Sequence, residues 1–362
     1  MPKRSSTWLV FIGAVALVAW AASAASGRGL AGIYNVQPLV SDSAAVPAPA
    51  TDASLVNGWG LSAGPTTPWW TSNNASNTST LYSGVGAKSA LTVSVAGGPT
   101  GTVFNGGTGF QVSHDGATAP ALFLFDTESG VIRGWNPNVP APAPSTKAFR
   151  VVDMRSEGAI FKGLAIAPTA HGDRLYATDF HNGKVDVFNE RFQPVNMPGA
   201  FEDPNIPDGY APFGIQTIGN HIFVTYAKQD ADAEDDVAGA GFGFVDMYGR
   251  GGKLLQRVAS MGSLDAPWGI AWAPDNFGEA SGDLLIGNFG DGAINIFEPE
   301  GYGEFEHEGS LHRVNGNPIV IQGLWALQFG NDGPAGPSST LFFTAGPAGE
   351  THGLFGSIEA QS

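Results

Sequence analysis

The chain contains no cysteine among its 362 residues. Its fold therefore has no disulfide, and the chain can form neither a thiolate metal site nor a catalytic thiol. Charged residues are also scarce, at 14%, and acidic residues dominate so that the formal net charge is -16. Nucleic acids and anionic membranes attract basic surfaces, so this composition argues against both as partners.

Long apolar runs are missing as well, apart from one run from Trp8 to Trp20. This run is shorter than the roughly 20 residues that a membrane-spanning helix needs. Two basic residues precede it and Ala22-Ser23-Ala24 follows it, an order typical of a secretory signal peptide. We expect residues 1–24 to be removed and residues 25–362 to form a single monomeric domain. Its location would be secreted or periplasmic, with no membrane anchor after cleavage.

Glycine and proline are abundant, with 51 and 25 residues. This abundance without a short period indicates many turns. Short runs such as 222–226 and 341–344 are rich in β-branched and aromatic residues and are bounded by Gly, Pro or Asn, which is typical of strands. No long stretch has a helical 3.6-residue period. We therefore expect an all-β fold.

A motif returns about every fifty residues, which marks an array of similar supersecondary units. One column of the repeat is a glycine that opens an apolar strand: Gly60, Gly101, Gly163, Gly214, Gly269 and Gly323. A second column ends the next strand: Asn73, Asp126, Asp179, Tyr226, Asn288 and Ala345. Six units of about four strands predict a six-bladed β-propeller. The glycines would lie near the axis, where backbones crowd.

The two ends of the chain fit this architecture. The residues after Gly323 provide three strands, at about 323–328, 340–344 and 353–358, and the segment Ile33–Val36 is a spare strand. We expect this N-terminal strand to complete the last blade and so to remove an open sheet edge.

Several strings resemble a family of secreted bacterial propeller proteins, some of which carry a sorting signal of the PEP-CTERM type. The matching segments are residues 55–61, 210–216, 224–230, 287–292 and 352–356. The resemblance implies a propeller fold and an exported location, and it implies no reaction.

Leu175–Asp179 and Asn182-Gly183 are similar to NHL-type and gluconolactonase-like six-bladed propellers. That resemblance implies a divalent metal in the channel, with an Asp often placed before the glycine that opens a strand. The corresponding residues here are Trp59, Thr100, Lys162, Phe213, Trp268 and Gln322. None is a carboxylate and Lys162 would repel a cation, which argues against metal-dependent lactone hydrolysis.

The start of each first strand and the end of each second strand lie at the same edge of a blade, so both columns meet at one mouth of the channel. The predicted ligand-binding residues there are Asn57, Trp59, Asn73, Asp179, Phe213, Tyr226, Lys228, Trp268, Asn288, Gln322 and His352. Aromatic and amide groups together suit a polar organic ligand. The alternatives are that Asp126, Asp179 and Asn288 cap their own hairpins and that Trp59, Phe213 and Trp268 pack between blades.

His181 and Lys162 are the candidate catalytic residues, because a histidine two residues after Asp179 can act as an acid or base and a lysine near the axis must be paired or hydrated. Ordinary loop or surface positions are the alternative. Asp230, Asp232 and Glu234 alternate as in loops that bind hard cations, although the EF-hand pattern fails. Loosely bound Ca²⁺ and a solvated acidic loop are the two interpretations, and no other cofactor is expected.

The function predicted from the sequence is a binding module for a polar ligand, either a glycan or a protein of the envelope or extracellular space. The alternatives are a lactonase-like hydrolase or lyase at the same mouth, and a structural component of the envelope. Convergence of His181, Lys162 and Tyr226 on one pocket would favour an enzyme.

Overall fold

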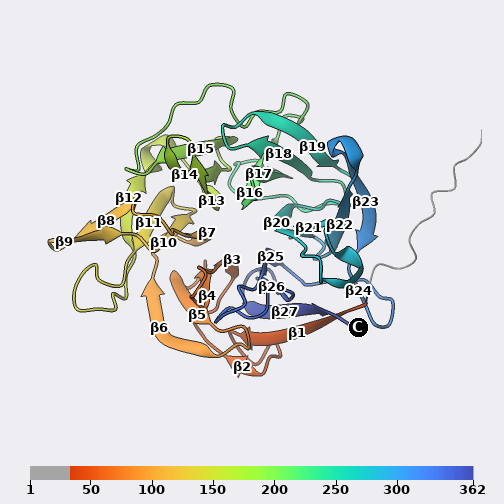
Figure 1. Cartoon of the computed structure of the whole chain (residues 1–362), viewed down its shortest axis with the longest axis horizontal. Coiled ribbons are helices and arrows are strands. Elements are labelled where there is room, and N and C mark those ends of the chain that lie inside the picture. Colours follow the sequence, from red (N-terminus) through yellow and green to blue (C-terminus); the bar gives the residue numbers. More distant parts are fainter. Residues whose placement is uncertain (1–32, 362) are drawn as a thin grey trace, which may run out of the picture.

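A computed structural model describes residues 33–361 of the chain, and the predicted signal peptide lies outside this range. The described chain is built from strands, with only three short 3-10 turns at Arg155–Glu157, Gly278–Ala280 and Gly301–Gly303. Six sheets surround a central axis (Figure 1), which confirms the predicted six-bladed propeller. Within the described range, no helix is long and apolar enough to cross a bilayer.

Each blade runs from an inner strand near the axis to an outer strand. Blade one contains β3 (Gly58–Ser62), β4 (Trp69–Asn73), β5 (Thr78–Tyr82) and β6 (Lys88–Ser94). Blade two contains β7 (Pro99–Phe104), β10 (Phe123–Thr127), β11 (Val131–Trp135) and β12 (Phe149–Asp153). Blade three contains β13 (Phe161–Thr169), β14 (Gly172–Asp179) and β15 (Lys184–Asn189).

The second half of the ring repeats this order. Blade four contains β16 (Tyr210–Ile218), β17 (His221–Lys228), β18 (Phe244–Gly249) and β19 (Leu254–Ser260). Blade five contains β20 (Pro267–Trp272), β21 (Leu284–Asn288), β22 (Ile294–Pro299) and β23 (Phe305–Ser310). Blade six contains β25 (Leu324–Phe329), β26 (Leu341–Ala345), β27 (Leu354–Ala360) and β1 (Ile33–Ser41).

The N-terminal strand closes the ring as predicted. β1 lies antiparallel to β27, with a register from Tyr34 opposite Ala360 to Ser41 opposite Leu354. Two short strands, β2 (Ala50–Thr51) and β24 (His312–Arg313), pair with β1 in parallel. The first and last parts of the described chain therefore share one sheet, where β1, in orange-red, lies beside β27, in blue (Figure 1).

Two blades depart from the simple four-strand expectation. Blade two carries an additional hairpin, β8 (Gln111–His114) and β9 (Ala117–Pro120), between its first two strands. Blade three has three strands in place of four. The segment after β15 contains Pro194 and Pro198, and proline cannot donate a hydrogen bond to a strand ladder. Only a short stretch of that segment therefore pairs with β15.

The strand-opening glycines lie where each inner strand contacts the next blade. A Cβ on Gly60 would lie 2.4 Å from the Thr100 oxygen, and one on Gly214 would lie 2.1 Å from the Trp268 oxygen. Such distances leave no room for a side chain, so the predicted reason for these glycines is supported.

In blade six, the prediction that Gly323 opens the inner strand was wrong. Gly269 faces the oxygen of Trp325, so Trp325-Ala326 occupies the position predicted for Gln322-Gly323. Gly323 precedes β25 with a φ of +65°, which is a turn conformation. The prediction was wrong here because a turn glycine three residues earlier resembled the glycine that opens a strand.

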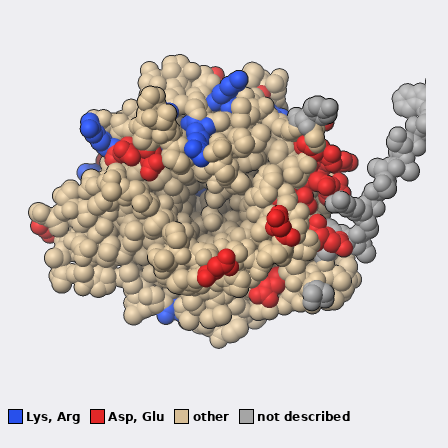
Figure 2. Space-filling model, viewed as in Figure 1, with Lys and Arg blue, Asp and Glu red and all other residues tan. Residues whose placement is uncertain are grey.

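Hydrophobic side chains fill the spaces between neighbouring blades. In one cluster, Leu285 and Ile294 of blade five pack with Phe343 and Ile358 of blade six. Acidic side chains instead gather at the rim, over β23 at the right of Figure 2, where Glu300, Glu304 and Glu306 are exposed. The hydrophobic interfaces between neighbouring blades fix the angle between the blades. They therefore position the loops that form the mouth of the channel.

Candidate functional site

The channel mouth is filled by aromatic side chains from several blades. The Trp325 ring lies 3.8 Å from the Trp59 ring and 4.0 Å from that of Phe289, between ring centroids. Phe213 and Trp268 pack edge-on against the same indole of Trp325. Trp59 and Trp325 are only 2% and 1% exposed. These rings form an aromatic floor that closes the channel.

Below this floor lies a small cavity. The cavity there has a volume of about 20 Å³ and is lined by residues that follow the opening glycines, among them Leu61, Leu164 and Ile270. A volume of this size holds about one water molecule. An organic ligand at the mouth must therefore lie above the floor.

Lys162 of β13 lies against the aromatic floor and is 1% exposed. Its Nζ donates to Glu128 Oε1 at 2.6 Å and to Asp235 Oδ1 at 2.9 Å. The same nitrogen lies 5.2 Å from the centre of the Trp59 ring, which adds a cation–π contact. Burial lowers the pKa of Lys162, but the two carboxylates outweigh it and the net pKa is raised. Lys162 is therefore a paired ammonium and not a free base.

Two more carboxylates share this region. Glu350 Oε2 accepts a hydrogen bond from Asn57 Nδ2 at 2.6 Å. Burial raises the pKa of Glu350, and the nearby charge of Glu128 raises it further. Burial also raises the pKa of Asp236 to about 7. We use "acidic mouth" for Glu128, Asp235, Asp236 and Glu350 around Lys162.

The acidic mouth is assembled from loops of different blades. Glu128 follows β10 of blade two, Asp235 and Asp236 follow β17 of blade four, and Glu350 follows β26 of blade six. Asn74 of blade one donates through Nδ2 to Glu128 Oε2 at 2.7 Å. Since these residues are far apart in sequence, no local motif indicated the cluster.

The loop with Asp230, Asp232 and Glu234 folds toward the mouth. Gln229 Nε2 donates to the Phe180 oxygen at 2.6 Å, and His181 Nδ1 lies 3.3 Å from the Ala233 oxygen. Asp230 Oδ1 accepts the Glu234 N–H, a bond that lowers the pKa of Asp230. Across residues 33–361, no group of three or more His, Asp or Glu is arranged to hold a metal ion. Calcium at this loop stays a prediction.

Three predicted ligand-binding residues are fully buried at the ends of their strands. Asn73 Nδ2 donates to Thr80 Oγ1 at 2.8 Å, and Asn288 Nδ2 donates to the Ser263 oxygen at 2.8 Å. Asp179 accepts from Asn182 Nδ2 at 2.7 Å. The structure thus places Asn73, Asp179 and Asn288 in internal hydrogen bonds. Asp179 and Asn288 also bond Asn182 and Asp291 within their own hairpins, as the capping alternative expects.

The other predicted mouth residues do not meet at one point. Lys228 Nζ lies 4.2 Å from the centre of the Phe242 ring, and His352 Nδ1 lies 2.9 Å from Asp42 Oδ2. Gln322 is exposed and accepts from the Ala348 N–H. Of the full predicted set, Asn57, Trp59, Phe213 and Trp268 belong to the mouth.

His181, Lys162 and Tyr226 do not converge on one pocket. The Tyr226 hydroxyl lies 2.5 Å from the Tyr248 hydroxyl, inside blade four. His181 is exposed and contacts a backbone oxygen, while Lys162 is engaged by its two carboxylates. The arrangement that would have favoured an enzyme is therefore missing for these three side chains.

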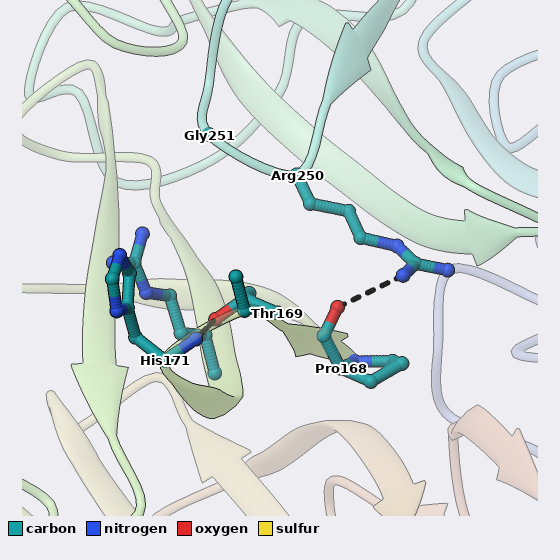
Figure 3. Close-up of a pocket in the computed structure, with 7 residues that line it drawn as sticks. Pro168, Thr169, His171, Arg250 and Gly251 are labelled. Atoms are coloured by element: carbon teal, nitrogen blue, oxygen red, sulfur yellow. Dashed lines mark hydrogen bonds between the residues drawn. The ribbon is translucent and has the colours of Figure 1, made fainter.

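Another cavity, of about 500 Å³, lies at the opposite edge of blades three and four (Figure 3). Its Arg250 points toward Pro168 and away from His171. The guanidinium donates to the Pro168 oxygen at 2.9 Å and to the Gly219 oxygen at 2.8 Å. Both terminal nitrogens of the guanidinium have acceptors in blades three and four, so Arg250 joins these two blades.

Comparison with solved structures supports the fold alone. The apo-form of the soluble aldose sugar dehydrogenase from Escherichia coli aligns with a TM-score of 0.55 at 13% identity, covering 91% of this chain and 100% of that one. A streptogramin B lyase structure aligns with a TM-score of 0.52 at 10% identity, covering 91% and 98%. At such identity no activity is transferred.

Comparison by sequence finds viral relatives, and no family model matches the chain. The "Uncharacterized protein R648" of Acanthamoeba polyphaga mimivirus is 33% identical over 325 residues, covering 85% of this chain and 76% of that protein. The "Uncharacterized protein L690" of the same virus is 30% identical, covering 91% of each. The bacterial family with sorting signals stays a prediction. The chain belongs to the same family as these two mimivirus proteins.

Proposed function

We propose that this propeller is a binding module whose acidic mouth takes a positively charged group of a polar ligand. The observation that carries the proposal is the set of four carboxylates, Glu128, Asp235, Asp236 and Glu350, around the single ammonium of Lys162. One lysine leaves this cluster with an excess of negative charge. A bound cation would offset that excess.

The electrostatics of the cluster favour a cationic ligand. Burial and neighbouring carboxylates raise the pKa of Glu350, and burial raises that of Asp236. An opposite charge within about 4–6 Å stabilises the ionised form of a carboxyl group. The ligand would therefore recover interaction energy that these groups lack when the mouth is empty. We favour an amino sugar in a glycan, because its ring can lie over the loops above the aromatic floor.

A hydrolase or lyase at the same mouth is less well supported. His181 and Lys162 lack a shared pocket, and Lys162 is a paired cation. The similarity to a lyase concerns the fold. Turnover of lactones, esters or uronides that disappears in His181→Ala would favour this alternative. A purely structural role in the envelope predicts neither binding nor turnover.

Isothermal titration with chitosan oligosaccharides and with their fully N-acetylated counterparts tests the proposal. We expect only the free amines to bind, and we expect Glu350→Gln to weaken binding about tenfold, the scale of one charge-assisted contact. Glu306→Gln is the matched control, because Glu306 is exposed on β23 away from the mouth. Equal binding of both sugars, or equal loss in the control, would contradict the proposal.

Export of the protein also remains a proposal. It rests on the order of basic, apolar and small residues before Ser26, outside the described residues. Fractionation of cells that express the full chain, with N-terminal sequencing of the product, would test cleavage after Ala24. A glycan ligand would suit that location.

A further inference from the structure

Blade three has no fourth strand, and only a short stretch near Pro194 pairs with its third strand, so part of that strand's edge stays open. The Val187 oxygen of β15 accepts the Val195 N–H at 2.8 Å, so the backbone groups of Val187 point away from β14. Residues two apart in a strand point to the same side. The N–H and C=O of Val185 therefore point outward too, and within residues 33–361 they have no hydrogen-bond partner.

A groove runs along this open edge. It has a volume of about 540 Å³, within the range of about 300–1,000 Å³ typical of ligand pockets. One wall is β15 from Lys184 to Phe188, and the other is the segment from Pro194 to Glu202. Met154 and Phe201 add apolar surface. The groove thus combines a strand edge that is open at Val185 with a second wall, which a flat edge lacks.

The charges in the groove are predominantly negative. Lys184 Nζ pairs with Asp186 Oδ1 at 2.9 Å, so these two charges offset each other. Glu157 and Glu202 are exposed in the groove, and neither forms an ion pair within the described part of the chain. Asp186 Oδ2 is buried without a hydrogen-bond partner there. A basic occupant would complement these carboxylates.

We infer that the groove of blade three binds an extended basic peptide segment of a partner protein, which adds to β15 as the missing fourth strand. Strand addition uses main-chain hydrogen bonds for affinity and side-chain pockets for specificity. The partner strand would be antiparallel, like the fourth strands of blades one, two, four and five. It would hydrogen-bond to Val185 and place basic side chains near Glu157 and Glu202.

Fluorescence polarisation with a labelled Lys-Val-Lys-Val-Lys-Val peptide tests this inference. We expect saturable binding, and at least tenfold weaker binding of the matching Glu-Val peptide. Val185→Pro removes the outward N–H without removing a bond to β14, because that N–H points away from it. We expect this variant to bind at least tenfold more weakly, while Val185→Thr stays within twofold of the parent protein. Thermal melting confirms that both variants fold.

Backbone pairing is separated from simple charge attraction by two further measurements. A Lys-Val peptide methylated on alternate backbone nitrogens keeps its charge, and we expect it to bind at least tenfold more weakly. Amide hydrogen exchange of Val185 should slow by at least tenfold when the unmodified peptide is bound. Equal binding by Val185→Pro or by the methylated peptide would overturn the inference. Both results are expected if the peptide binds at the acidic mouth or through charge alone, because neither mode uses backbone pairing at Val185. Dimers of the free protein that Val185→Pro abolishes would identify a second copy as the occupant and would also overturn it.

Discussion

Trp325 Nε1 donates to Asn57 Oδ1 at 2.9 Å, although the two residues are 268 positions apart. Trp325 belongs to the inner strand of blade six, and Asn57 precedes the inner strand of blade one. The bond joins the two ends of the ring beside the axis, while β1 joins them at the outer edge. The propeller is therefore closed twice, once at the inner strand of blade six and once at its outer strand.

Asn57→Ala tests the inner closure. The substitution leaves the buried N–H of Trp325 without its acceptor, which costs roughly 1–3 kcal/mol of unfolding free energy. Asn57 also has a φ of +50°, where alanine adds about 1–2 kcal/mol of strain. Asn57→Gly is the matched control, because glycine keeps the conformation and loses only the side chain. The unfolding free energy measured in urea should be highest for the parent protein, lower for Asn57→Gly and lowest for Asn57→Ala. An equal stability of all three would contradict the role of this bond.

Tyr34→Phe tests how β1 is held. The Tyr34 hydroxyl donates to the Phe277 oxygen at 2.9 Å and accepts the Ala280 N–H at 3.0 Å, so it ties β1 to blade five. Removing it leaves two backbone groups unpaired, and we expect a loss of about 1–3 kcal/mol in denaturant unfolding. Amides of β1 should then exchange faster than those of β16. Unchanged exchange in β1 would show that pairing with β27 suffices.

Gly214→Ala tests the crowding near the axis. The new Cβ would lie 2.1 Å from the Trp268 oxygen, which belongs to the backbone of the next blade. Because that backbone cannot rotate away, we expect a loss of about 3 kcal/mol or more in unfolding free energy. Gly251→Ala is the control, since nothing lies within 4 Å of its Cβ position. A thermal melt that leaves both variants equal to the parent would rule out tight contact between blades.

The pH dependence of stability should reflect buried carboxyl groups. Burial raises the pKa of Asp126 from 3.8 to about 7 in the folded protein. Between these values the folded state keeps a proton that the unfolded state has lost, so this group lowers stability as the pH rises from about 4 to 7. We expect Asp126→Asn to reduce that slope in thermal melts. Asp236 and Asp246 have raised pKa values of about 7 and about 6, so they contribute a slope of the same sign that remains in the variant. A parent protein most stable at pH 8 would contradict this account.

The repeat made the ring predictable. In five blades a glycine lies where the inner strand contacts the next blade, and the crowding there explains why this glycine repeats along the sequence. In blade six the corresponding residue is Ala326, and the turn glycine Gly323 gave a wrong register. Because of this wrong register, Trp325 was not predicted as a mouth residue. Its hydrogen-bond partner Asn57, which precedes the inner strand of blade one, was predicted.

The architecture, six blades and their closure by an N-terminal strand, was determined by the sequence itself, because strand periodicity and backbone crowding are local and repeat along the chain. The mouth was decided only by the tertiary structure. Lys162, Glu128, Asp235 and Glu350 come from four blades, and each is an ordinary residue in its own segment. Their pairing depends on how neighbouring blades pack and where the loops end, which is a long-range property that no short motif encodes.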